Sequence, residues 1–283
     1  MRQTSSVLYI AVDSLIPAQG PAIPGFAEFT AELDLLGIPA VWLTSRSRLQ
    51  FDTARRKLSH GHPFLAEAGC GVFLPEDYFH LRPEIVDSKH QKSSVIRLGR
   101  FTCIPAAQLP PAAANALERL SEDTGAPIVN LRTLSPRELL QNTGLPLREA
   151  ELARQRDFDE LFFFAGASEE SIKNFLAESR ARNLQLRQNG VLWSLAIDAS
   201  TGHCIRELTK LYDRSLRYHA ETLAIATPDL AADLFPHCER RILLTPRKLA
   251  KDLPSPVSLP AQDIPLYSVG VWEVILDALD AKK

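Results

Sequence analysis

The sequence predicts an α/β fold in which a doubly wound parallel sheet is interrupted by an inserted α+β unit. Three observations support this prediction. Strand-like apolar runs alternate with amphipathic helices near the N-terminus, and the same alternation returns after Asp198. Between these parts the pattern changes, and Asn189-Gly190 gives a strong two-residue hairpin signal. We therefore expect a core domain of residues 1–90 and 196–283, with an inserted α/β cap domain of residues 91–195.

The first strand is expected at residues 6–12, an apolar run that stops at Asp13. A run that is apolar on both faces is typical of a parallel strand whose sheet is covered on both sides. Ligands of open α/β sheets bind beyond the carboxyl ends of the strands, which makes Asp13 the first candidate site residue. The position is equally compatible with a plain turn, because Asp followed by Ser is a common way to leave a strand.

The next segments continue a strand–helix–strand–helix order. Apolar residues recur at three- and four-residue spacing over residues 26–36, which predicts a helix that ends at Gly37. Residues 38–43 form a second buried apolar run. Ser45 is suited to be the N-cap of a helix over residues 46–58. This order is typical of a parallel βαβ sheet.

Thr44 and Ser45 follow the second strand at its carboxyl end. If the first two strands are neighbours, as sequential strands usually are, both hydroxyls lie beside Asp13. Together with Arg46 and Arg48 they form a candidate phosphate site at a helix N-terminus. The alternative is that the hydroxyls only cap the helix and that both arginines are solvated.

The remaining elements follow from the same patterns. Short strands are expected at residues 63–66, 72–75 and 95–98, with a polar crossing between domains over 76–92. The inserted domain is expected to contain helices at 111–124, 147–156 and 168–182, a helix opened by the capping box Ser135-Pro136-Arg137-Glu138, strands at 127–130 and 160–164, and a hairpin over 184–195. Further on we expect helices at 202–212, 230–235 and 271–279, strands at 222–226 and 241–244, and a proline-rich loop over 251–265.

The composition narrows the function classes. The 283 residues, 45% of them hydrophobic, suffice for a large core. The net charge of -2 and the scattered basic residues give no general attraction to nucleic acid or to acidic membranes. The four cysteines lie far apart, without a CxxC pair or a histidine at metal-ligand spacing, so we expect reduced thiols and a cytoplasmic protein. No segment approaches the length of a membrane span.

Several segments, taken together and in order, carry a resemblance to one known family. They are residues 37–48, 62–69, 72–75, 143–146, 150–160 and 270–273. With this layout, the sequence resembles the haloacid dehalogenase superfamily, and more narrowly the mannosyl-3-phosphoglycerate phosphatases. The resemblance spans nearly the whole chain, and it implies a haloacid dehalogenase-like core with an inserted cap domain.

The resemblance also implies a catalytic pattern that this sequence keeps only in part. The family's Asp-x-Asp pair follows the first strand, and here it reads Ala11-Val12-Asp13, so a methyl group stands at the position of the nucleophile. Asp13 matches the general acid and base, and Thr44 matches the hydroxyl that contacts phosphate. Thr201 stands at the position of the family's lysine, and Thr227 at that of a magnesium-binding aspartate.

The residues that the resemblance assigns to ligand binding are better retained. They are Ser45, Arg46 and Arg48 in the core, and Arg154, Arg156, Asp157 and Glu160 in a cap segment that faces phosphoglycerate and sugar in the family. For the cap residues, an ordinary charged helix end is an equally open interpretation. His203, Arg206 and Asp229 remain open as substitutes for the lost cation or the lost carboxylate.

We therefore expect a mannosyl-3-phosphoglycerate phosphatase-like protein with little or no phosphatase activity, which binds a small phosphorylated or carboxylated sugar-type ligand. We expect no metal-ligand set and no cofactor. The first alternative is an active phosphoric monoester hydrolase with rearranged catalytic residues, which would need Mg²⁺. The second alternative is a structural subunit that binds a protein partner.

Overall fold

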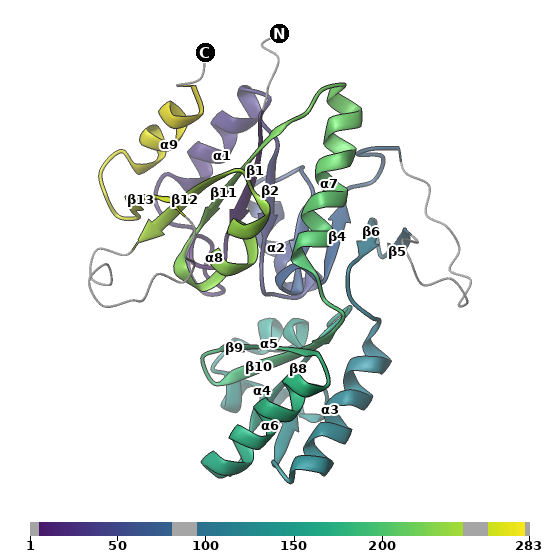
Figure 1. The fold of residues 1–283 in the computed structure, drawn as a ribbon. Coiled ribbons are helices and arrows are strands. Elements are labelled where there is room, and N and C mark those ends of the chain that lie inside the picture. Colours follow the sequence, from purple (N-terminus) through teal and green to yellow (C-terminus); the bar gives the residue numbers. More distant parts are fainter. Residues whose placement is uncertain (1–5, 81–94, 246–259, 281–283) are drawn as a thin grey trace.

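The computed structural model describes residues 6–80, 95–245 and 260–280, and within them it shows two sheets with helices around each (Figure 1). The strands of the larger sheet are β1 (Ser6–Ala11), β2 (Ala40–Leu43), β3 (Phe64–Ala66), β4 (Gly71–Leu74), β5 (Ile96–Leu98), β6 (Phe101–Pro105), β11 (Glu221–Ala226), β12 (Arg240–Thr245) and β13 (Gln262–Pro265). The strands of the smaller sheet are β7 (Ile128–Asn130), β8 (Glu160–Phe164), β9 (Leu184–Asn189) and β10 (Leu192–Ile197). The helices are α1 (Phe26–Leu35), α2 (Arg48–Lys57), α3 (Pro110–Thr124), α4 (Pro136–Thr143), α5 (Leu147–Ala153), α6 (Glu169–Ala181), α7 (Thr201–Leu216), α8 (Pro228–Leu234) and α9 (Val271–Asp280).

The order of strands in the larger sheet is β13-β12-β11-β1-β2-β3-β4-β6-β5 among the described residues. Strands β13 to β3 pair in parallel, whereas β4, β6 and β5 extend the sheet by antiparallel pairs. The smaller sheet is antiparallel, with the order β7-β8-β10-β9. The predicted fold class is therefore confirmed: a mainly parallel core sheet is accompanied by a separate antiparallel α/β unit.

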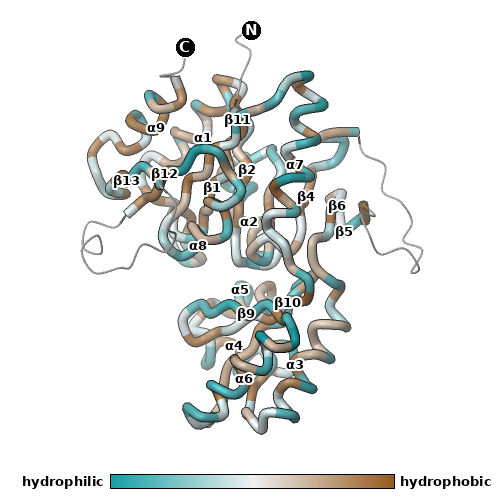
Figure 2. The backbone as a smooth tube through the Cα atoms, viewed as in Figure 1, coloured by the Kyte–Doolittle hydropathy of each residue, from teal (hydrophilic) through white to brown (hydrophobic). Residues whose placement is uncertain are grey.

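Strand β1 is buried on both faces of the larger sheet. Leu8 and Ile10 pack in a hydrophobic cluster with residues of α1 and α9, whereas Val7 and Tyr9 pack in a second cluster with residues of α7 and α8. Figure 2 shows the central strands of this sheet coloured mostly as hydrophobic. This two-sided burial is the reason why the first strand is apolar throughout rather than alternating.

The smaller sheet also has helices on both faces. Leu117 of α3 and Phe175 of α6 pack with Phe162 on one face, and Leu139 of α4 packs in a smaller cluster with Phe163 on the other. The hairpin predicted at Asn189-Gly190 is confirmed, because β9 and β10 pair across it. The capping box that opens α4 is confirmed as well.

The expected start of the inserted domain at residue 91 is too early by the criterion of strand pairing. Strands β5 and β6 belong to the larger sheet, because β6 pairs antiparallel with β4 and β5 pairs with β6. Phe101 and Cys103 of β6 are buried in the same cluster as Phe64 and Phe73 of the core. The smaller sheet draws its strands from residues 128–197.

Several expected helix limits differ from the structure. Helix α2 begins after Ser47, whose hydroxyl forms a capping box with Gln50, so the N-cap is not Ser45. The helix expected over 147–156 ends at Ala153, the helix expected over 202–212 continues to Leu216, and the helix expected over 230–235 begins at Pro228. The end of the expected proline-rich loop forms edge strand β13, while residues 251–259 of that loop and 81–92 of the polar crossing lie outside the described residues.

Two further features of the described structure are the hydropathy of its helices and the state of its cysteines. None of the described helices combines the length and the hydropathy that a bilayer span requires. The four cysteines are all buried and form no disulfide, as expected from their spacing.

His60 is the most unusual residue of the core. Its ring stacks on Trp42 with 3.7 Å between ring centroids and an angle of 12° between planes, and its Nε2 has no hydrogen-bond partner in the described part of the chain. Burial, with a smaller contribution from the neighbouring His62, lowers the pKa of His60 well below its ordinary value. The folded protein therefore keeps His60 neutral under conditions in which the unfolded chain protonates it.

We predict that His60 makes the protein sensitive to acid, and that His60→Phe, which preserves a ring against Trp42, reduces this sensitivity. Below the ordinary histidine pKa the unfolded state binds the extra proton, so stability falls as the pH drops. Between about pH 7 and pH 5 a single histidine that is kept neutral contributes at most about 2 kcal/mol. Urea unfolding of both proteins at both pH values measures it. Equal losses of unfolding free energy in the two proteins would contradict the prediction.

Candidate functional site

Three neighbouring parallel strands bring polar residues to one edge of the larger sheet. Strand β1 lies between β2 and β11, and all three run in the same direction. Asp13 follows β1, Thr44 follows β2 and Thr227 follows β11. The carboxyl ends of parallel strands meet at one edge, so these residues converge although up to about 200 positions separate them in the sequence.

The Asp13 carboxylate is bonded on both oxygens. Oδ1 accepts a hydrogen bond from the Thr44 hydroxyl, and Oδ2 accepts from the Ser45 backbone N–H at 2.8 Å and from the Ser45 hydroxyl at 2.5 Å. Arg46 Nε lies 3.4 Å from Oδ1 and completes an ion pair. The expectation that Thr44 and Ser45 lie beside Asp13 is confirmed. Helix α2 begins at Arg48, two residues later than expected, with Ser47 as its N-cap.

A second polar cluster surrounds the end of β11. The Thr227 hydroxyl is 3.2 Å from that of Ser14 and is also bonded to Asp229, whose other carboxylate oxygen accepts from Ser14 at 3.3 Å. Thr201, at the start of α7, donates its hydroxyl hydrogen to the Ala68 carbonyl at 2.9 Å. Both threonines are therefore used for local bonding within the protein.

A cavity of about 340 Å³ lies between the core and the inserted domain. Its charged lining residues are Asp13, Arg46, Arg156, Asp159, Arg187 and Asp229. Its lining also includes Ala18, Gln50, Gln188, Asn189 and Trp193. The volume suits a small polar molecule. Each lining arginine is paired with a carboxylate: Arg46 with Asp13, Arg156 with Asp159, and Arg187 with Asp233.

The predicted cap residues are only partly at this cavity. Arg156 lines it, whereas Arg154 donates to the Leu134 carbonyl at 3.0 Å within the inserted domain. Glu160 is almost fully buried and paired with Arg132 at 2.7 Å. Arg48 and Asp157 form an ion pair with two hydrogen bonds, of 2.9 and 3.2 Å, which joins α2 to the inserted domain. The cavity lining does not include Arg154, Glu160, Arg48 or Asp157.

Glu67 is the site residue that the sequence analysis missed. It follows β3, and its carboxylate, 1% exposed, accepts backbone N–H bonds from three consecutive residues of the inserted domain: Asp157 at 2.8 Å, Phe158 at 2.8 Å and Asp159 at 3.0 Å. Burial, together with the nearby Asp159 carboxylate, raises the pKa of Glu67 to about 8. A carboxylate directly after a strand at the same edge as Asp13 was a usable signal.

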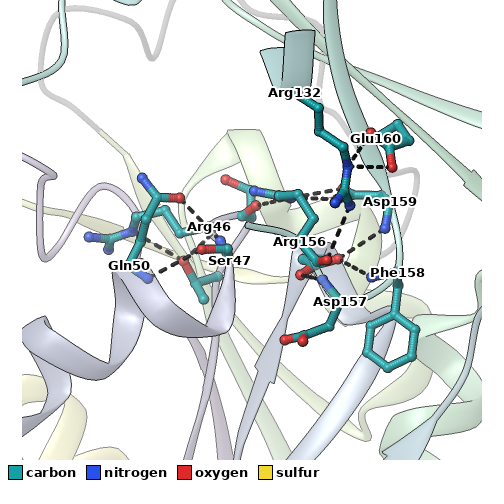
Figure 3. A network of polar contacts seen from close by, with 12 residues as sticks. Arg46, Ser47, Gln50, Arg132, Arg156, Asp157, Phe158, Asp159 and Glu160 are labelled. Atoms are coloured by element: carbon teal, nitrogen blue, oxygen red, sulfur yellow. Dashed lines mark hydrogen bonds and ion pairs between the residues drawn. The ribbon is translucent and has the colours of Figure 1, made fainter. Parts of the chain in front are cut away.

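Arg156 completes the contact between the two domains. It is paired with Asp159 and donates from Nη2 to the Ser45 carbonyl of the core at 2.8 Å, in the network shown in Figure 3. Burial opposes its charge, but the carboxylates of Asp159 and Glu67 outweigh that effect and raise the pKa of Arg156. Ser47 adds a bond from its hydroxyl to the Leu152 carbonyl at 2.8 Å. We call this set of contacts the Glu67 joint.

Comparisons with known proteins agree with this architecture. A glucosyl-3-phosphoglycerate/mannosyl-3-phosphoglycerate phosphatase of Methanococcoides burtonii is 28% identical over 205 residues, 71% of each chain, and a mannosyl-3-phosphoglycerate phosphatase of Pyrococcus furiosus is 27% identical over 160 residues, 56% of this chain and 60% of that one. The solved structure of a haloacid dehalogenase-like hydrolase from Bacteroides thetaiotaomicron superimposes with a TM-score of 0.63 at 12% identity, over 97% of this chain and 100% of the other. No protein-family model matches the sequence.

The chain has the fold of haloacid dehalogenase-like hydrolases. A second solved structure, a haloacid dehalogenase-like hydrolase from B. subtilis, superimposes with a TM-score of 0.57 at 15% identity and covers 84% of this chain and 89% of its own. At these identities the solved structures bear on the fold alone.

The haloacid dehalogenase-like site does not fit a magnesium ion with the described residues. Ala11, Thr201 and Thr227 present a methyl and two hydroxyl groups where the resemblance places a carboxylate, an ammonium and a carboxylate. Both oxygens of Asp13 are already bonded to protein donors. Among the residues with described positions, no group of three or more His, Cys, Asp or Glu could hold a metal. Magnesium requires several oxygen ligands in octahedral geometry, and the described residues do not supply them here.

We predict that Glu67→Ala lowers the free energy of unfolding by about 3 kcal/mol or more, because three buried backbone N–H groups lose their hydrogen-bond acceptor. Chemical denaturation with a two-state fit measures the loss. Glu76→Ala is the matched control, since that glutamate forms an exposed pair with Arg97 and should cost less than about 1 kcal/mol. A loss for Glu67→Ala no larger than that of the control would show that the joint does not stabilise the fold.

Proposed function

We propose that the protein binds a sugar phosphate or phosphoglycerate-type ligand in the cavity between its domains, and that it has little or no phosphatase activity. Two observations support the proposal that the cavity binds such a ligand. The curated relatives are named as phosphatases of glucosyl- and mannosyl-3-phosphoglycerate. The cavity is lined by guanidinium groups of Arg46, Arg156 and Arg187, by the amides of Gln188 and Asn189, and by Trp193, which is a set that can bind anionic and hydroxyl groups.

One observation supports the proposal that the protein has little or no phosphatase activity. Strand β1 ends in Ala11, which is 1% exposed and packed in the hydrophobic cluster beneath α7 and α8. An aspartyl-phosphate intermediate needs a carboxylate at that point, and a methyl group cannot attack phosphorus. Asp13 could still transfer a proton, but its carboxylate is held by Thr44, Ser45 and Arg46. General acid–base help without a nucleophile supplies only part of the catalysis.

A second candidate function is an active phosphatase with rearranged residues. The observation that favours it is that Asp13 and Asp229 both line the cavity, so two carboxylates are available, one after β1 and one at the start of α8, which follows the neighbouring strand β11. In this mechanism Asp13 would act as the acid and Asp229 would stand in for a lost carboxylate.

We predict no turnover of mannosyl-3-phosphoglycerate or p-nitrophenyl phosphate above the rate without protein, with or without magnesium, because the nucleophile position holds a methyl group. Inorganic phosphate release measures it. Robust hydrolysis that falls by several orders of magnitude in Asp13→Ala, and not in the buried-cysteine control Cys204→Ser, would establish the second candidate instead.

A reversion tests whether the three replaced positions have been assigned correctly. The triple variant Ala11→Asp, Thr201→Lys and Thr227→Asp should gain magnesium-dependent hydrolysis of mannosyl-3-phosphoglycerate, because it restores the attacking carboxylate, the cation and a metal ligand. All three side chains are buried, so circular dichroism must first show that the variant folds. A folded triple variant that binds the ester and releases no phosphate would refute the assignment.

A further inference from the structure

The turn after β3 contacts both segments through which the chain crosses between the two domains. The chain leaves the larger sheet after β6 and returns after β10. The Cys70 carbonyl accepts from the Ala106 N–H of the first crossing at 2.8 Å, and the Ala106 carbonyl accepts from the Ser200 N–H of the second at 3.0 Å. Glu67 of the same turn accepts the backbone N–H bonds of residues 157–159. The turn therefore lies at the pivot between the domains, and any change in the charge of Glu67 acts at that pivot.

The buried charges around Glu67 do not balance. Asp159 is 2% exposed and is paired with Arg156, and Asp157 is paired with Arg48 (Figure 3). Glu67 forms no ion pair of its own with any described residue. Three carboxylates thus share two guanidinium groups, which leaves one negative charge uncompensated in a place that water does not reach.

The other titratable groups near the joint do not supply the missing positive charge. The charged ones are paired elsewhere: Glu160 with Arg132, Arg187 with Asp233, and Arg46 with Asp13. The nearby thiols stay neutral, because burial raises the pKa of each. They are Cys70, Cys103 and Cys204. A proton on Glu67 is therefore the simplest way to remove the excess charge.

Glu67 can take up that proton and keep most of its hydrogen bonds. Its Oε1 accepts one N–H, from Asp157, whereas its Oε2 accepts two, from Phe158 and Asp159. A proton on Oε1 leaves both bonds of Oε2 in place. The loss of one backbone hydrogen bond costs less than an uncompensated buried charge, so the closed joint favours the protonated carboxyl group.

We propose that the Glu67 joint holds one proton, and that the loss of this proton in mildly alkaline solution loosens the inserted domain from the core. The pKa of Glu67 agrees, because burial first and the Asp159 carboxylate second raise it to about 8. In an open joint water reaches Glu67, and its pKa returns toward the ordinary value of about 4.5. The closed joint thus binds the proton more tightly. Its advantage is complete below about pH 4.5 and is lost as the pH rises through about 8.

Hydrogen exchange of the backbone amides of residues 157–159 tests the proposal in the full chain, because these amides exchange when the joint opens. After correction for the chemical exchange rate at each pH, their protection in the wild type should fall about tenfold per pH unit between about pH 6 and pH 8. In Glu67→Gln, which is neutral at every pH, the protection should not depend on pH. Glu76→Gln is the matched control, since Glu76 is exposed and paired with Arg97, and it should follow the wild type.

A second measurement needs no variant. Infrared difference spectra of the wild-type protein between about pH 7 and pH 9 should show the loss of one protonated carboxyl group. Protection that is constant with pH in the wild type, or that falls equally in Glu67→Gln, would overturn the proposal. So would the absence of a protonated carboxyl group at about pH 7. None of these outcomes bears on the proposed function, because the inference does not depend on a ligand.

Discussion

Two hydroxyls, one backbone N–H and one guanidinium hold the Asp13 carboxylate at the end of β1, and the geometry of the whole cleft depends on that contact. It exists because β1 and β2 are parallel neighbours, so that the residues after each strand meet. The contact fixes the backbone from Thr44 to Arg46. That segment in turn accepts bonds from the turn after β3, where Glu67 N–H bonds to the Arg46 carbonyl and Ala68 N–H to the Thr44 carbonyl. Anchoring one carboxylate therefore orders two consecutive loops.

The Glu67 joint carries this order into the inserted domain. Glu67 and Ala68 both have a φ of 53°, which is uncommon for residues with a Cβ and costs about 1–3 kcal/mol at each position. The contacts that this conformation permits offset the cost, because the Glu67 carboxylate then accepts three backbone N–H bonds from across the domain boundary. The same joint sets the position of Arg156, so the cation at the cavity wall is placed by the packing of the two domains.

Local patterns in the sequence predict most of the fold and only part of the site. Uniformly apolar runs identify β1 and β2, Asn189-Gly190 identifies the hairpin, and strand order brings Asp13 beside Thr44. Patterns cannot rank competing partners, which is why Ser45 was expected to cap α2 when its hydroxyl bonds to Asp13 instead. Contacts such as those of Glu67, made with residues about ninety positions away, leave no periodic trace in the sequence. The membership of β6 in the core sheet likewise depends on tertiary packing.

The three positions at which this sequence departs from the family pattern that it resembles are consistent with one another on electrostatic grounds. If only Ala11 had replaced a carboxylate, a lysine at position 201 would be left buried without that partner, and a buried unpaired charge costs several kcal/mol. If only Thr201 had replaced the lysine, the carboxylates at the strand ends would repel one another without a cation between them. With all three positions neutral, Asp13 needs a single counter-ion, and Arg46 supplies it at 3.4 Å. Arg46 therefore supplies from within the protein the counter-ion of Asp13, and this carboxylate needs no metal ion for that purpose.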